Sequence, residues 1–212
     1  MKIGMIGDSH SQVIFPMVSS ALSSAGHPVS LQVSRPGLSE KAFLNDADLW
    51  SQIAYAKPER MIIALGGNNM EGSSYVLTTL SPLISRLRDA GVKDIIWIGP
   101  FRSDEVKAAS TAVRHERTRG YLSGGLVALG VPFVDVYDIT DLSGSNDGVH
   151  LTPAAYRRVV EQIKPQLLAW ARGEGSTALV LGVPRLYVFA GAGVLSTLLF
   201  ALLLRRRSRR RR

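Results

Sequence analysis

The chain has 212 residues, of which 46% are hydrophobic and 20% charged, a composition that supports a packed core and excludes a disordered chain or a collagen-like fibre. The net charge of +8 lies entirely in the last segment, because residues 1–183 hold 17 Lys or Arg and 17 Asp or Glu, whereas residues 184–212 hold eight Arg and no acid. This distribution excludes a basic globular domain that wraps nucleic acid, and the absence of Cys excludes disulfides, thiol catalysis and thiolate metal sites.

Residues 1 to about 172 alternate between short runs rich in β-branched residues and longer amphipathic stretches, which is the pattern of an α/β fold. Strands are expected at 2–7, 29–33, 60–65, 94–98 and 132–136. Helices are expected at 11–26, 40–56, 75–90 and 105–129, with a site for a break at Gly124 and Gly125, and from Pro153 onward, where Thr152 suits an N-cap. We therefore predict a three-layer α/β/α sandwich around a five-stranded parallel sheet.

The C-terminal part has a different character. Residues 172–185 form a short linker that starts polar and Gly-containing, and a stretch of 19 residues without charge runs from Leu186 to Leu204. As a helix this stretch spans about 28 Å, close to the hydrocarbon thickness of a bilayer. The Arg-rich tail 205–212 follows directly, as it does after many membrane spans. We expect a single transmembrane helix at 186–204; the alternative is a buried helix of an oligomer, which normally carries a polar stripe.

The tail also suggests partners and a location. Segment 205–212 is expected to bind anionic lipid headgroups, with nucleic acid as the alternative, because both carry phosphates. Small residues at 190–193 could let a helix of a second copy approach, which would give a homo-oligomer.

The expected location is a membrane, with a virion membrane as one option. The Arg tail is expected on the cytoplasmic side of the membrane, which would place the hydrolase-like domain outside. The N-terminal segment does not read as a cleaved signal peptide that could export this domain, so the sequence leaves the orientation open.

Three polar motifs follow predicted strands, at the edge of the sheet where open α/β folds bind ligands. They are Gly7-Asp8-Ser9-His10, Gly66-Gly67-Asn68-Asn69 and Asp147-Gly148-Val149-His150. The first offers a serine at a helix N-terminus, the second a neutral amide donor, and the third a carboxylate that can orient an imidazole base. Each alone is more often a turn or a helix cap, but their joint occurrence favours nucleophilic catalysis.

In these motifs the chain resembles the SGNH hydrolases, also called the GDSL esterase and lipase family, over residues 1–171. The resemblance implies a flavodoxin-like fold, with Ser9 as the nucleophile, His150 as the base and Asp147 as the acid that orients it. It also implies an oxyanion hole formed by the Ser9 backbone N–H, the Asn68 side chain and the N–H of a glycine after the second strand. Gly37 has the right position for that glycine. No cofactor is expected.

Two positions depart from the usual family motifs. His10 stands where Leu is commonest, which is expected to alter the helix start and the pocket wall, and Asn69 stands where Asp is usual. His10 is a rival candidate for the base, although the residue after Ser9 on a helix points elsewhere. We expect His27 in a loop and His115 on a solvated helix face. No group of His and carboxylates has the spacing of metal ligands, so no metal is predicted.

The sequence thus predicts a membrane-anchored esterase, with residues 1–171 as the hydrolase-like domain. Ser9 would attack an acyl ester and His150 would carry the proton. The expected substrates are O-acetylated envelope glycans or lipid esters, because a membrane anchor favours both. The alternative is a membrane-anchored structural protein, for example of a virion, whose esterase-like domain binds without hydrolysing.

Overall fold

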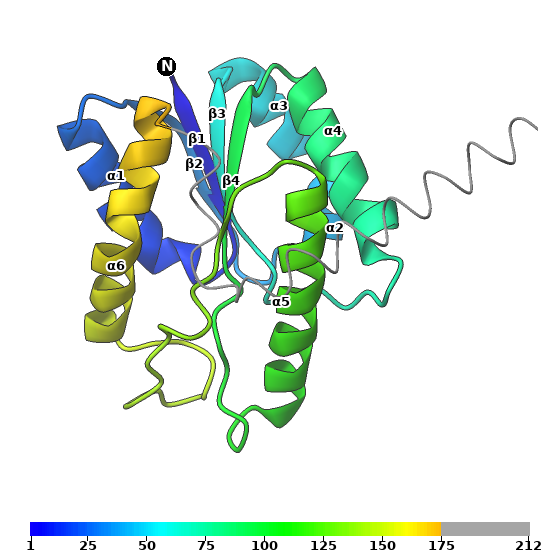
Figure 1. Ribbon diagram of the computed structural model, residues 1–212, viewed down its shortest axis with the longest axis vertical. Helices are drawn as coiled ribbons and strands as arrows, with labels where there is room; N and C mark the ends of the chain where they lie inside the picture. The colour runs from blue at the N-terminus through cyan, green and yellow to red at the C-terminus, as the bar shows by residue number, and fades with distance from the viewer. Residues whose placement is uncertain (175–212) are drawn as a thin grey trace, which may run out of the picture. The chain divides into compact units, whose positions relative to one another are not determined.

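Five parallel strands form the central sheet of the computed structural model, which describes residues 1–174 (Figure 1). Their order is β2-β1-β3-β4-β5, and every neighbouring pair is parallel. The strands are β1 (Ile3–Gly7), β2 (Val29–Ser34), β3 (Arg60–Ala64), β4 (Asp94–Ile98) and β5 (Phe133–Val134). Every residue of β1 and β3 is buried, as expected for central strands that are covered on both faces. The predicted five-stranded parallel sheet is confirmed.

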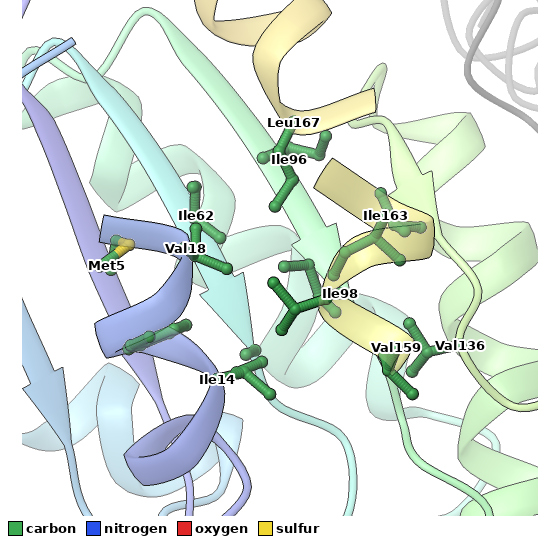
Figure 2. Close-up of a cluster of buried hydrophobic side chains, with 14 of the residues drawn as sticks. Met5, Ile14, Val18, Ile62, Ile96, Ile98, Val136, Val159, Ile163 and Leu167 are labelled. Carbon is green, nitrogen blue, oxygen red and sulfur yellow. The ribbon is translucent and has the colours of Figure 1, made fainter. Parts of the chain in front are cut away.

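Helices cover both faces of this sheet and complete the predicted three layers (Figure 1). One face carries α1 (Ser11–Ser24) and α6 (Pro153–Arg172). The other carries α2 (Glu40–Asn45), α3 (Ala47–Ala56), η1 (Val76–Leu80), α4 (Ser81–Asp89) and α5 (Ala109–Ala128). Each helical layer shares a buried apolar cluster with the sheet; Figure 2 shows the one beneath α1 and α6, which includes Ile14, Val18, Ile96, Val159 and Ile163.

Two predicted helices are each divided in the structure. The helix expected at 40–56 is broken at Asp46, whose extended backbone ends α2 and whose Oδ1 accepts a hydrogen bond of 3.0 Å from the N–H of Leu49 to cap α3. The helix expected at 75–90 begins with the π-helical turn η1. Pro82 follows at the start of α4, and because it has no N–H it cannot donate to the carbonyl one turn earlier.

The predicted break at Gly124 and Gly125 is wrong, since α5 continues through both residues. Gly125 is instead a site of close packing, because a Cβ atom there would lie 3.0 Å from a methyl carbon of Val76 and 3.1 Å from one of Leu80. The helix starts at Ala109 rather than at 105, and β5 is confined to two residues. Thr152 caps α6 as predicted, with its Oγ1 accepting from the N–H of Ala155.

The transmembrane helix predicted at 186–204, the Arg tail and almost all of the linker lie outside the described residues. Within residues 1–174, none of the helices is both long enough and apolar enough to span a bilayer.

Candidate active site

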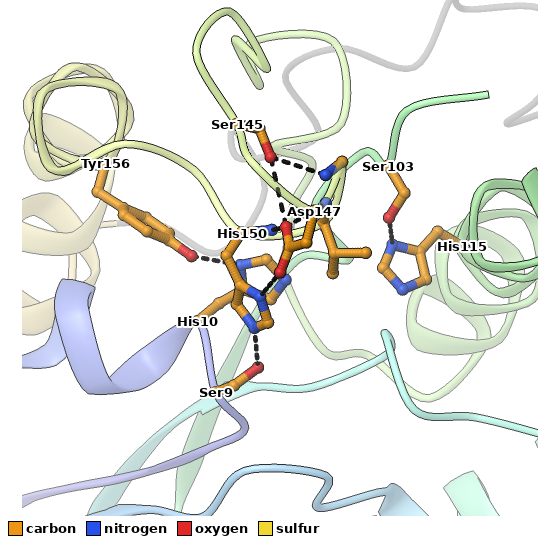
Figure 3. A network of polar contacts seen from close by, with 10 residues as sticks. Ser9, His10, Ser103, His115, Ser145, Asp147, His150 and Tyr156 are labelled. Atoms are coloured by element: carbon orange, nitrogen blue, oxygen red, sulfur yellow. Dashed lines mark hydrogen bonds and ion pairs between the residues drawn. The ribbon is translucent and has the colours of Figure 1, made fainter. Parts of the chain in front are cut away.

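Ser9, His150 and Asp147 form one chain of polar contacts at the carboxyl edge of the sheet (Figure 3). Ser9 follows β1, and its Oγ lies 3.0 Å from Nε2 of His150. The other ring nitrogen, Nδ1, lies 2.6 Å from Oδ2 of Asp147. A proton on Nδ1 therefore leaves the lone pair of Nε2 facing the serine hydroxyl, which is the tautomer that a general base requires.

The loop before α6 fixes the carboxylate of Asp147. Its Oδ1 accepts hydrogen bonds of 2.8 Å from the backbone N–H groups of Val149 and His150, and one of 3.4 Å from the Ser145 hydroxyl. The side-chain contact with His150 is the largest of the influences that hold the pKa of Asp147 well below its usual range. Asp147 is thus a carboxylate throughout the neutral pH range, and it can stabilise a proton on His150.

A second imidazole, that of His10, lies behind His150. The His10 ring is buried, stacks on Phe101 at a centroid distance of 4.4 Å, and lies 5.3 Å from the His150 ring. Its Nδ1 is 2.8 Å from the hydroxyl of Tyr156. Burial is the main cause that lowers the pKa of His10 to about 3, so this ring is neutral and adds no positive charge beside His150. Within residues 1–174 the Ser9 hydroxyl contacts the ring of His150 and not that of His10, which favours His150 over the rival candidate.

Asn68 lines the same cavity as Ser9 and His150, and two hydrogen bonds hold its side-chain amide. Its amide nitrogen donates a hydrogen bond of 3.2 Å to the carbonyl of Leu38 and one of 3.4 Å to Oδ2 of Asp8. Asp8 is almost fully buried, and this burial raises its pKa to about 7. Both hydrogen bonds of the Asn68 amide are long, so an oxyanion could replace Leu38 or Asp8 as an acceptor at a small cost in free energy.

Backbone donors complete the site. Ser9, Gly37, Asn68 and His150 all line one open cavity of about 410 Å³. Among the hydrogen bonds within residues 1–174, the N–H groups of Ser9 and Gly37 have no acceptor. Gly37 has a left-handed backbone, with a φ of 76°, which favours glycine. Asn69 points elsewhere, because its Oδ1 accepts from the N–H of Glu71.

Two side chains of α5 bind the turn between β3 and Asn68. The carbonyl of Gly67 accepts a hydrogen bond of 2.9 Å from Nε of Arg114 and lies 3.0 Å from Nε2 of His115. On its other side, Nδ1 of His115 lies 2.7 Å from the Phe101 carbonyl and 3.0 Å from the Ser103 hydroxyl. Gly67 itself must be small, because a Cβ atom there would lie 3.1 Å from His115 Nε2.

Comparison with solved structures shows which known proteins have a similar fold. Over 78% of this chain and 96% of the other, the structure matches a lipase/acylhydrolase from Enterococcus faecalis with a TM-score of 0.60 and 20% identity. It matches TesA over 79% and 98% with a TM-score of 0.64 and 20% identity, and an acetylxylan esterase from Geobacillus stearothermophilus over 78% and 93% with a TM-score of 0.60 and 15% identity. This is the fold of the SGNH hydrolases. Neither protein-family models nor curated protein sequences give a match.

The SGNH fold brings together all the site residues named from the sequence: Ser9, Gly37, Asn68, Asp147 and His150. His27 lies in the loop before β2, as predicted. Within residues 1–174, no three His, Asp or Glu side chains lie close enough together to hold a metal ion.

The prediction that His115 faces solvent is wrong, because only 2% of it is exposed. The charged neighbours in the sequence suggested a solvated face, but the helix buries a stripe of small or apolar residues that includes position 115. The buried residues of this helix are Ala112, His115, Thr118, Leu122, Gly125 and Leu126. Their spacing of three or four residues was the signal that could have identified His115 as a buried residue. Arg114 and Asp8 were also given no role from the sequence, although both line the cavity.

Proposed function

We propose that this protein is a serine esterase that hydrolyses acyl esters through Ser9, His150 and Asp147. The observation that carries the proposal is the continuous contact from Asp147 through His150 to Ser9, which ends in a cavity with several hydrogen-bond donors. The similar folds support it, because their names describe a lipase/acylhydrolase and acetylxylan esterases. A triad on this edge of the sheet is the arrangement from which acyl transfer proceeds.

In the first half of the reaction, the Ser9 oxygen attacks the acyl carbon while Nε2 of His150 takes the hydroxyl proton. The carbon–oxygen bond to the alcohol then breaks, and His150 passes its proton to the departing alkoxide oxygen. This leaves an acyl group on Ser9 and a neutral imidazole. In the second half, water attacks the acyl carbon, His150 accepts a proton from the water and returns it to the Ser9 oxygen as the carboxylic acid leaves.

The negative charge of each tetrahedral intermediate develops on the former carbonyl oxygen. We assign its stabilisation to the N–H groups of Ser9 and Gly37 and to the side-chain amide of Asn68. These donors are neutral, and two of them belong to the backbone, so they can be aimed in advance at the developing charge. The oxyanion would displace Leu38 or Asp8 as a partner of the Asn68 amide.

We further propose that the natural substrate is an O-acyl ester of an envelope glycan or a lipid, and that the protein is anchored in a membrane by residues 186–204. The anchoring rests on the 19 uncharged residues and the Arg tail that follows them. Partition of the full chain and of a chain ending at residue 181 between membranes and an alkaline carbonate wash tests it. Release of both forms into the wash would contradict an integral anchor.

Hydrolysis of p-nitrophenyl esters by the full chain tests the esterase proposal. An acyl series from acetate to decanoate should be hydrolysed by the wild type and by Ser24→Ala, an exposed serine on α1 that serves as the control. Ser9→Ala should reduce the rate to that of the buffer. A folded wild-type protein that hydrolyses no ester of the series faster than Ser9→Ala would contradict the proposal and favour the alternative of a binding domain.

A further inference from the structure

Arg114 is a half-buried arginine on α5 that lines the same cavity as Ser9 and His150. Two contacts to oxygen hold its guanidinium in place: Nε donates to the Gly67 carbonyl at 2.9 Å, and Nη2 donates to the Thr111 hydroxyl at 3.3 Å. Within the described part of the chain the remaining terminal nitrogen, Nη1, donates only to the thioether sulfur of Met70, at 3.6 Å. A thioether is a weak acceptor, so this guanidinium keeps donors for a ligand.

The charge of Arg114 is also not neutralised by a neighbour. Within residues 1–174, six other arginines form ion pairs with carboxylates, whereas Arg114 forms none. On the cavity wall the other titratable groups are Asp8, His10, His115 and His150. Burial lowers the pKa values of His10 and His115, so both rings favour the neutral form. Burial raises the pKa of Asp8 to about 7, so this carboxyl is partly protonated at neutral pH. Arg114 is therefore the permanent positive charge among the residues that line this wall.

We propose that Arg114 binds a carboxylate of the substrate beside the ester that Ser9 attacks, so that the preferred substrates are acyl esters with a carboxylate on the acyl or the alcohol side. The inference rests on the proposed esterase function and names its substrate class. A planar guanidinium fixed by two hydrogen bonds matches the two oxygens of a carboxylate and loses little conformational freedom on binding.

Pairs of esters that differ only in charge test this site with the full chain. For the acyl side, p-nitrophenyl hydrogen succinate is compared with p-nitrophenyl succinamate, in which an amide replaces the carboxylate. For the alcohol side, 4-acetoxybenzoate is compared with 4-acetoxybenzamide. The side whose anionic ester has the higher kcat/KM relative to its neutral partner in the wild type is the side on which the Arg114 variants are then compared.

Arg114→Gln should lower that ratio about tenfold, mostly through KM, which is the scale of one charge-assisted hydrogen bond. Arg114→Lys should retain part of the preference. The neutral ester is the internal reference, because loss of the Gly67 contact affects both esters alike. Arg117→Gln, an exposed change on the same helix, should leave the ratio unchanged. An equal loss on the anionic and neutral esters in Arg114→Gln would overturn the assignment.

A failure of the esterase proposal is distinguishable from a failure of this one. If the wild type hydrolyses neutral esters through Ser9 and the ratio does not depend on Arg114, only the carboxylate site is wrong. If no ester is hydrolysed, calorimetric binding of succinate and 4-hydroxybenzoate to the wild type and to Arg114→Gln decides. Binding of either anion that Arg114→Gln abolishes supports the site, and absence of binding to the wild type overturns it.

Discussion

Nε2 of His150 lies 3.0 Å from Oγ of Ser9, although the two residues are 141 positions apart in the chain. The hydrophobic core fixes this distance. Ser9 lies just before α1 and His150 just before α6, and these helices share one apolar cluster on the same face of the sheet. Val18 of α1 and Val159 and Ile163 of α6 are nearly inaccessible to solvent within it. The packing of two helices thus brings the proposed nucleophile and its proposed base together without a covalent link.

Replacement of Asn68 by Ala should lower kcat about 10²-fold or more while KM changes little, because the amide is assigned to the oxyanion of the intermediate rather than to the bound ester. Steady-state kinetics on p-nitrophenyl butyrate measure both constants. Asn45→Ala, at the end of α2, is the matched control, since the side-chain amide of Asn45 donates only to the Lys41 carbonyl among residues 1–174. A kcat for Asn68→Ala within about threefold of the wild type would remove Asn68 from the oxyanion hole.

Asp8 should make the free energy of unfolding depend on pH. Burial raises the pKa of this carboxyl to about 7 in the folded protein, from 3.8 for an ordinary Asp. The folded state therefore keeps a proton that the unfolded chain releases, and the stability from Asp8 is complete below pH 3.8 and is lost as the pH rises to about 7. Relative to Asp8→Asn, which cannot titrate, the wild type should lose stability over this range.

Urea unfolding of the full chain at several pH values between 4 and 8 measures this difference. His10 has a lowered pKa and therefore reduces the stability of both proteins at acidic pH. This contribution cancels when the free energy of unfolding of Asp8→Asn is subtracted from that of the wild type. The expected change is a few kcal/mol, at about 1.4 kcal/mol for each pH unit between the folded and unfolded pKa values. Parallel stability curves for the wild type and Asp8→Asn would show that Asp8 is ionised in the folded state throughout.

Gly124 and Gly125 should respond in opposite ways to Ala. At Gly125 a methyl group would lie 3.0 to 3.1 Å from side-chain carbons of Val76 and Leu80, so Gly125→Ala should destabilise the fold by about 1–3 kcal/mol. At Gly124 no atom of the described residues lies within 4 Å of the new Cβ, so Gly124→Ala should stabilise α5 by up to about 1 kcal/mol. Thermal unfolding of both variants tests this, and stabilisation by Gly125→Ala would contradict the close helix contact.

The sheet and the meeting of the three polar motifs at one of its edges were predictable because local signals there agreed with the fold. The apolar runs of β1 and β3 end directly before the motifs that contain Ser9 and Asn68, and parallel strands bring such ends to one edge. The break in the helix expected at 40–56 was not predicted. Asp46 suits either the polar face of a continuous helix or the N-cap of a new one, and the sequence does not decide between these two roles.

The environments of His115 and Arg114 could not be predicted for a different reason. His115 has charged neighbours in the sequence, but its surroundings are set by Gly67 and Phe101, which lie on loops after other strands. The lack of an ion pair at Arg114 within residues 1–174 depends on where distant carboxylates lie. Such properties arise from the packing of segments that are far apart in the chain, and periodicity within one helix carries only part of that information.

Labelling of the full chain with a fluorophosphonate, followed by intact and peptide mass spectrometry, tests the central claim most directly, because the reagent reacts with activated serine nucleophiles. The account predicts a single adduct on Ser9, none in Ser9→Ala, and labelling slowed about 10²-fold or more in His150→Ala, the scale of a lost general base. An adduct on another serine, or labelling of Ser9 at the same rate without His150, would contradict the assignment of this triad.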